Sequence, residues 1–147
     1  MPDPPFDGKL ATHKPLPQGK AFLICEEAEL DDITGQFSFF NVVSSLGFPK
    51  FPAESPPLAI YLQLYDGIGR YELGIELRNL ADDTSVTAEN FSSLDFPERL
   101  VKMELVLPID AMRFPRPGRY ELVILFEGQE LATQFIDAEV SNGSETR

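Results

Sequence analysis

Few side chains in this chain of 147 residues have the types and spacing that catalysis or metal binding requires. The single histidine, His13, stands alone in a proline-rich stretch, so neither a Ser-His-Asp triad nor a multi-histidine metal site is expected. The single cysteine, Cys25, is followed by Glu26 and Glu27. Because neighbouring carboxylates raise the pKa of a thiol, we predict that Cys25 is an unreactive residue of the core.

The most concentrated polar group is acidic, with five carboxylates between residues 26 and 32. Calcium is bound by several carboxylate and carbonyl oxygens, which makes this segment a candidate calcium site. The segment lacks the regular spacing of a calcium-binding loop, so a solvated connection is the favoured interpretation. The chain also has no glycine-rich phosphate loop, and we expect no catalytic residue, no cofactor and no bound metal.

Two groups of residues are candidate contacts with a protein partner. A connection that contains four prolines also holds Phe48 and Phe51. Prolines lower the ordering cost of binding and the two rings supply apolar area; the alternative is that both rings cap the open end of a core. Arg113, Arg116 and Arg119 reverse the sign of charge locally. They are either solvated surface residues or a basic end for docking.

The overall composition excludes several classes of partner. A formal net charge of −12 argues against nucleic acid, because phosphate contacts need a basic face. The longest apolar run is far too short to cross a membrane. With no recognisable secretory leader and a single cysteine, a cytoplasmic location is expected. The kinds of partner that remain are therefore another protein or a second copy of the same chain.

Alternation of apolar and polar residues predicts strands. It is strictest from Arg70 to Asn79 and recurs over 119–127, and both stretches begin with GRYEL, at 69–73 and 118–122. We interpret GRYEL as one strand entry used twice, in which glycine permits the turn and tyrosine starts the buried row. Tyr120 is expected to bond the preceding turn through its hydroxyl group, as in a tyrosine corner.

The remaining elements follow from similar signals. Gly128-Gln129 has the form of a two-residue type II′ turn, and one helical turn is expected over 108–112. Further strands are expected over 21–26, 36–43, 58–65, 85–89 and 101–107. Seven or eight short strands punctuated by glycine and proline predict an all-β fold, an antiparallel β-sandwich with immunoglobulin-like architecture.

One domain is expected, the β-sandwich over residues 21–140. Residues 1–20 hold five prolines and two glycines and are predicted to form an extended arm. This arm is expected to be dispensable for folding and able to dock through Phe6 and Leu10, in cis or on a neighbour. Residues 141–147 are expected to form a disordered polar tail.

One combination of segments resembles a known family. It consists of Cys25-Glu26-Glu27, the stretch GQFSFFNV at 35–42, Phe48-Pro49, and PGRY at 117–120. This combination, within residues 21–140, resembles a family of small bacterial and phage-associated proteins catalogued only as a domain of unknown function. The resemblance implies a compact bacterial β-sandwich, and it implies no activity and no site residues.

We therefore expect a non-enzymatic module for protein–protein interaction or assembly. The alternative is a β-sandwich that binds a small ligand, either carbohydrate or calcium, on an open face or an end loop. Aromatic side chains and carboxylates that converge in a concave groove would favour the ligand alternative. A flat apolar patch would favour the interaction module.

Overall fold

The computed structural model describes residues 15–98 and 101–141, and within them it contains strands and no helix. Eleven strands are present in this part of the chain. In order they are β1 (Gln18–Leu30), β2 (Phe37–Val42), β3 (Ser45–Phe48), β4 (Ala53–Glu54), β5 (Leu58–Tyr65), β6 (Gly69–Asn79), β7 (Thr84–Phe96), β8 (Met103–Ile109), β9 (Arg113–Phe114), β10 (Gly118–Phe126) and β11 (Gln129–Val140).

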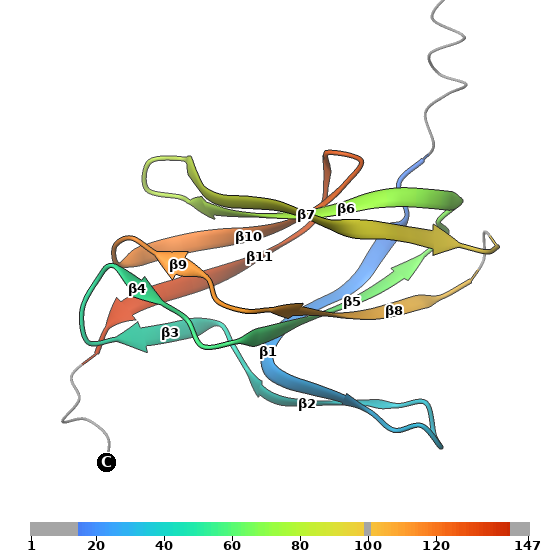
Figure 1. Cartoon of the computed structure of the whole chain (residues 1–147), viewed down its shortest axis with the longest axis horizontal. Coiled ribbons are helices and arrows are strands. Elements are labelled where there is room, and N and C mark those ends of the chain that lie inside the picture. Colours follow the sequence, from blue (N-terminus) through green and yellow to red (C-terminus); the bar gives the residue numbers. More distant parts are fainter. Residues whose placement is uncertain (1–14, 99–100, 142–147) are drawn as a thin grey trace, which may run out of the picture.

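Two sheets form the β-sandwich (Figure 1). One has the order β2-β1-β5-β8, and the other has the order β3-β11-β10-β6-β7, in which β3 runs parallel to β11. β4 and β9 form a separate two-stranded ribbon. The predicted all-β, immunoglobulin-like sandwich is confirmed, but the predicted count of seven or eight strands was too low. The predicted connections contain the short strands β3, β4 and β9, which are too brief to show alternation.

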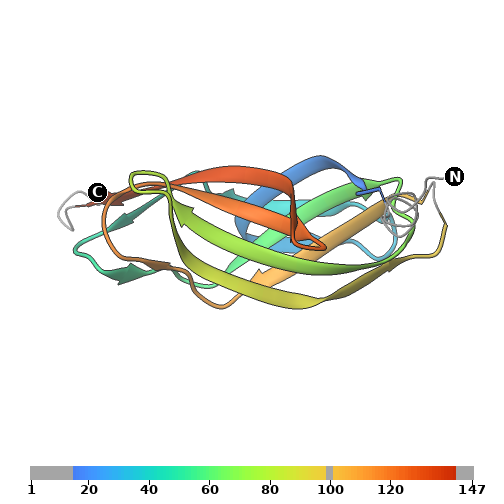
Figure 2. The same cartoon turned by 90° about the horizontal axis from the view of Figure 1, so that it is seen from above.

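The sandwich is elongated and flattened, and β1 begins at the end opposite to the one where β11 ends (Figure 2). Its core is made of the inner rows of both sheets. On β5 that row is Leu58, Ile60, Leu62 and Leu64. On the facing sheet, neighbouring strands β6 and β10 match apolar residues in register, as with Leu77 opposite Leu122. Burial of such side chains contributes roughly 1.5–3 kcal/mol each and is the main force that holds the two sheets together.

The two GRYEL tyrosines close opposite ends of this core. β6 and β10 are antiparallel neighbours, so Tyr71 lies near Phe126 and Tyr120 lies opposite Asn79. Both tyrosines are fully buried. Gly69 and Gly118 have φ values of 72° and 148°, in the region that favours glycine, which explains the glycine before each strand.

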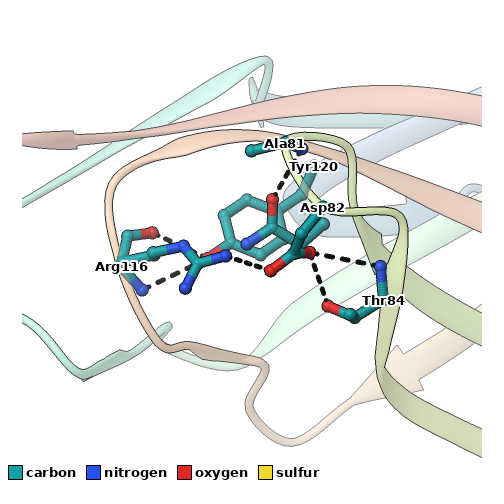
Figure 3. A network of polar contacts seen from close by, with 6 residues as sticks. Ala81, Asp82, Thr84, Arg116 and Tyr120 are labelled. Atoms are coloured by element: carbon teal, nitrogen blue, oxygen red, sulfur yellow. Dashed lines mark hydrogen bonds and ion pairs between the residues drawn. The ribbon is translucent and has the colours of Figure 1, made fainter.

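The predicted tyrosine corner at Tyr120 is confirmed. Its hydroxyl group donates to the carbonyl oxygen of Arg116 at 2.7 Å and accepts from the N–H of Arg116 at 3.3 Å (Figure 3). Tyr71 makes a similar pair with different partners. Its hydroxyl group accepts from the N–H of Ile68 at 2.9 Å and donates to the carbonyl oxygen of Pro15 at 2.8 Å. The first GRYEL copy therefore fastens the residues that precede β1.

The turn between β10 and β11 differs from the prediction. Glu127 and Gly128 occupy it, with φ values of 54° and 77°, so the turn is type I′ and not a type II′ turn at Gly128-Gln129. A register shift between Ile124 and Leu125 then moves the pairing by one residue. As a result Gln134, and not Phe135, lies opposite Leu122.

The expected helical turn over 108–112 is also absent. β8 continues through Pro108, which pairs with Ala59, and through Ile109, which pairs with Leu58. β8 is an edge strand, where the missing N–H of proline costs no ladder bond.

The sandwich begins earlier in the chain than residue 21. Residues 18–20 belong to β1, Pro17 is buried, and Leu16 packs against the core. The rest of the predicted arm, with Phe6, Leu10 and His13, lies outside the described residues, as does the predicted tail beyond Ser141. In the described part of the chain, no helix is long and apolar enough to cross a membrane.

Loss of either buried tyrosine hydroxyl should weaken the fold. Tyr120→Phe and Tyr71→Phe should each lower the free energy of unfolding by about 1 kcal/mol, because each removes one hydroxyl that serves backbone groups at an end of the core. The midpoint of urea unfolding measures this change. Tyr65→Phe, at a half-buried position on β5, is the matched control. An unchanged midpoint for Tyr120→Phe would contradict the assignment.

Candidate functional site

The structure places the predicted aromatic contacts inside the molecule. Phe48 is only 8% exposed. Its ring lies 5.5 Å from that of Phe51 and 5.8 Å from that of Phe114, and Phe51 is half-buried against the core. These rings cap one end of the sandwich, and Phe48 has little surface left to offer a partner.

The three predicted arginines do not converge on one basic surface. Arg116 forms an ion pair with Asp82, whose carboxylate also accepts from Thr84 (Figure 3). Arg119 donates to both carboxylate oxygens of Asp137, at 2.7 and 3.2 Å. Arg113 is exposed on β9. Two of the three guanidinium groups are therefore neutralised within the chain.

A different surface stands out, the hairpin formed by residues 25–42. We call it the acidic hairpin; it comprises the second half of β1, a tight loop and β2, and it forms the lower edge of the molecule in Figure 1. The predicted first strand ended at Glu26, but β1 runs on to Leu30. Its carboxylates therefore lie along a strand and around a turn instead of in an irregular loop.

Two features shape the acidic hairpin. Asn41 has a φ of 58°, and its side-chain amide donates to the carboxylate of Glu26 at 2.9 Å, which marks an irregular step where the hairpin leaves the sheet. At the tip, the carboxylate of Asp31 accepts from the N–H groups of Ile33 and Thr34 at 2.8 and 3.2 Å. These backbone hydrogen bonds lower the pKa of Asp31 and identify it as the residue that forms the turn.

Tyr61 anchors the acidic hairpin to the outer face of its sheet. Its ring centroid lies 5.2 Å from that of Phe37 and 4.7 Å from that of Phe39. Its hydroxyl group donates to the carboxylate of Glu104 on β8 and accepts from the amide of Gln63. One face of β2 is therefore packed on the sandwich, and the other face is left to solvent.

The acidic hairpin exposes apolar as well as acidic side chains. Ile33 at the tip is 94% exposed and Val42 is 59% exposed. Leu30 and Phe40 are also exposed, so four of the seven large apolar side chains exposed in the described residues belong to this one hairpin. Singly scattered apolar residues are normal on a surface, but a group of four on one element is unusual and makes this hairpin the candidate site.

On the five-stranded sheet, the outer face is occupied by polar contacts. Arg78 on β6 lies among three carboxylates, those of Glu76 at 2.9 Å, Glu130 at 3.3 Å and Glu121 at 3.8 Å. The exposed ring of Phe135 is covered by the guanidinium group of Arg119, 5.3 Å from its centroid. The two sheets therefore present chemically different surfaces.

The described residues contain no metal centre, and the hollows on their surface are small. No group of three or more His, Cys, Asp or Glu side chains in that part of the chain is arranged to hold a metal ion. A cavity of about 270 Å³ is lined by Ile75, Met112, Glu89 and Asp110, among others. Its volume lies just below the range typical of small-molecule sites. A more open hollow of about 370 Å³, lined by residues that include Lys20, Tyr65 and Asp66, lies at the lower end of that range.

The sequence offered one signal for the acidic hairpin. No Lys or Arg occurs from Ala21 to Pro49, and residues 37–42 carry no charge at all. The sequence predicts a strand over 36–43 but not which of its aromatic side chains are exposed, because Phe39 and Phe40 are adjacent and the alternation is imperfect. In the structure Phe39 packs on Tyr61 at the outer face of the sheet, and Phe40 is exposed.

Cys25 should be inert in the folded protein. It is fully buried, and burial raises its pKa, which suppresses the reactive thiolate. A thiol reagent should label the native protein much more slowly than the urea-unfolded protein. Equal labelling rates would contradict the buried assignment.

Tyr61 should ionise late. Burial, together with the hydrogen bond to Glu104, raises its pKa to about 12 from the ordinary value near 10. The folded state therefore favours the neutral phenol, and this contribution to stability is complete below pH 10 and disappears as pH rises through 12. Absorbance titration of phenolate should show a late step that Tyr61→Phe removes. A wild-type curve without that step would contradict the anchor.

Comparison with known proteins places this geometry in context. Solved structures with similar folds include an alkylpurine DNA glycosylase from Pseudomonas fluorescens (10% identity, TM-score 0.43, covering 80% of this chain and 30% of that one). An immunoglobulin-like protein from Pseudomonas aeruginosa has 12% identity, a TM-score of 0.40, and coverage of 85% of this chain and 98% of its own. A β-glucosidase from Listeria innocua has 7% identity and a TM-score of 0.42, and the match covers 82% of this chain and 16% of that one.

No curated protein matches the chain. A family model does match, over residues 20–137, and its description is a family of unknown function (DUF6941). The match covers most of the chain and confirms the resemblance predicted from residues 21–140. The chain belongs to this family of unknown function.

Proposed function

We propose that this protein is a non-enzymatic module for protein–protein interaction that binds its partner through the acidic hairpin. The observation that carries the proposal is the gathering of four exposed apolar side chains, Leu30, Ile33, Phe40 and Val42, on that one element. Carboxylates lie between and beside them. Apolar area supplies binding free energy, and the surrounding charge selects the partner.

The chemistry of the described residues supports a binding role over catalysis. The nucleophile with the greatest intrinsic reactivity, Cys25, is buried with a raised pKa. Asp82 and Asp137 are each paired with an arginine, which lowers their pKa; the bond from Thr84 contributes most at Asp82. Groups in these states serve structure, since a general base needs a pKa near the working pH.

Binding of a small ligand is the less supported alternative. Such a ligand would fit in the cavity beside Met112, which is lined by Glu89 and Asp110, or in the open hollow beside Tyr65 and Asp66. The aromatic side chains that a carbohydrate would stack on, Phe37, Phe39 and Tyr61, are packed against one another instead.

An affinity experiment tests the proposed function. The tagged protein would recover a partner from an extract of its own cells, and Ile33→Ser/Phe40→Ser should reduce that recovery at least tenfold, because it removes apolar area from the acidic hairpin. Leu80→Ser/Val140→Ser is the matched control, since it removes exposed apolar side chains elsewhere. Equal loss with both double variants, or no loss with the first, would contradict the proposal.

A further inference from the structure

The sheets of the sandwich end in four edge strands, and three of them carry features that block further pairing. The pairing between β7 and β6 shifts register twice, after Leu73 and after Leu77 of β6. β8 contains Pro108, and β3 is only four residues long. Irregularity, proline and shortness are the usual ways in which proteins protect an exposed edge.

β2 is longer than β3, contains no proline, and is irregular only at Asn41, near its C-terminal end. It pairs on one side with β1 and on the other side has no strand among the described residues. It runs for six residues as Phe-Ser-Phe-Phe-Asn-Val, without charge or proline, and its register with β1 is regular from Phe37 to Phe40. An edge of this kind is a template for one more strand.

The hydrogen-bonding register shows which groups are available. Asp31 donates its N–H to the carbonyl oxygen of Gln36 at 2.9 Å. Because bonded and non-bonded pairs alternate along an antiparallel ladder, Ser38 and Phe40 direct their backbone groups toward β1. Phe37 and Phe39 direct theirs to the free edge.

We propose that β2 accepts an extended segment of a partner protein as a fifth strand, and that this segment alternates basic and apolar residues. This inference rests on the proposed function and names the chemistry of the partner. On the solvent face, Ser38 lies opposite Glu29 and Phe40 lies opposite Glu27. No salt bridge reaches Glu27 or Glu29 from the described residues.

The geometry explains both halves of the alternation. A residue added beside Ser38 would lie two strands from Glu29, about 10 Å away, and a long basic side chain can extend across the small serine to reach the carboxylate. Residues on the opposite face of the added strand would lie beside Phe37 and Phe39, so apolar side chains fit there. A second copy of β2 would supply the apolar residues of this alternation but not the basic ones, because it brings further carboxylates to the same face.

Binding of a synthetic peptide tests the proposal. The probe is acetyl-Lys-Val-Lys-Val-Lys-Val-Lys-amide, and the control peptide has the same composition in two blocks, four lysines followed by three valines. The alternating peptide should bind at least tenfold more tightly in calorimetric titration. Hydrogen exchange should slow at the amides of Phe37 and Phe39, which face the free edge.

Matched variants separate edge pairing from attraction to an acidic protein. Ser38→Lys should weaken binding of the alternating peptide at least tenfold, and Ser38→Glu should retain it. Ser85→Lys changes net charge equally on an exposed residue of edge strand β7 and should leave the affinity within twofold. Near-ultraviolet circular dichroism confirms that all three variants fold.

Several outcomes would overturn the proposal. The first is equal affinity for the two peptides, and the second is equal weakening of peptide binding by Ser38→Lys and Ser85→Lys. The third is a wild-type dimer in light scattering that Ser38→Lys dissociates, which would identify a second copy of the chain as the occupant. If the natural partner is lost with Ile33→Ser/Phe40→Ser but retained with Ser38→Lys, the proposed function stands and the added strand is wrong.

Discussion

The structure depends on closing the two ends of a long, flat core. Inner rows of apolar side chains cover each other between the sheets, but an open sandwich leaves backbone groups of the end loops close to that core, where unpaired polar groups are costly. Tyr71 and Tyr120 solve this at opposite ends, because each ring fills apolar space and each hydroxyl serves both a donor and an acceptor of the backbone. The repeated pentapeptide therefore reflects a physical requirement that arises twice.

Once the core is closed, the acidic hairpin is the element on which exposed apolar side chains gather. Arg78 and Arg119 form ion pairs on the outer face of one sheet, and Arg119 also lies over the ring of Phe135. On the other sheet, Tyr61 holds Phe37 and Phe39 and thereby fixes the orientation of β2. The binding surface that we propose is therefore ordered in the free protein, which would lower the entropy lost on association.

Much of the fold was predictable because it depends on the alternation of apolar and polar residues along each strand. The strand over 58–65 matches β5, and the stretch 70–79 matches β6 within one residue. The β10–β11 turn was mispredicted because a bulge after Ile124 shifts the register, and such a bulge leaves no local mark in the sequence. The candidate site was missed for a related reason. Whether Phe40 points into a core or to solvent depends on Asn41, where the backbone takes a left-handed conformation that changes the path of the hairpin.

The uncharged stretch of β2 also makes the solubility of the protein depend on the charged residues of the neighbouring strand. Strands of this composition stack readily on copies of themselves, and at neutral pH the neighbouring carboxylates of Glu27 and Glu29 oppose that stacking through mutual repulsion. Replacement of both glutamates by glutamine would remove this opposition. β2 would then be left as a nucleus for aggregation, while the core behind it stays intact.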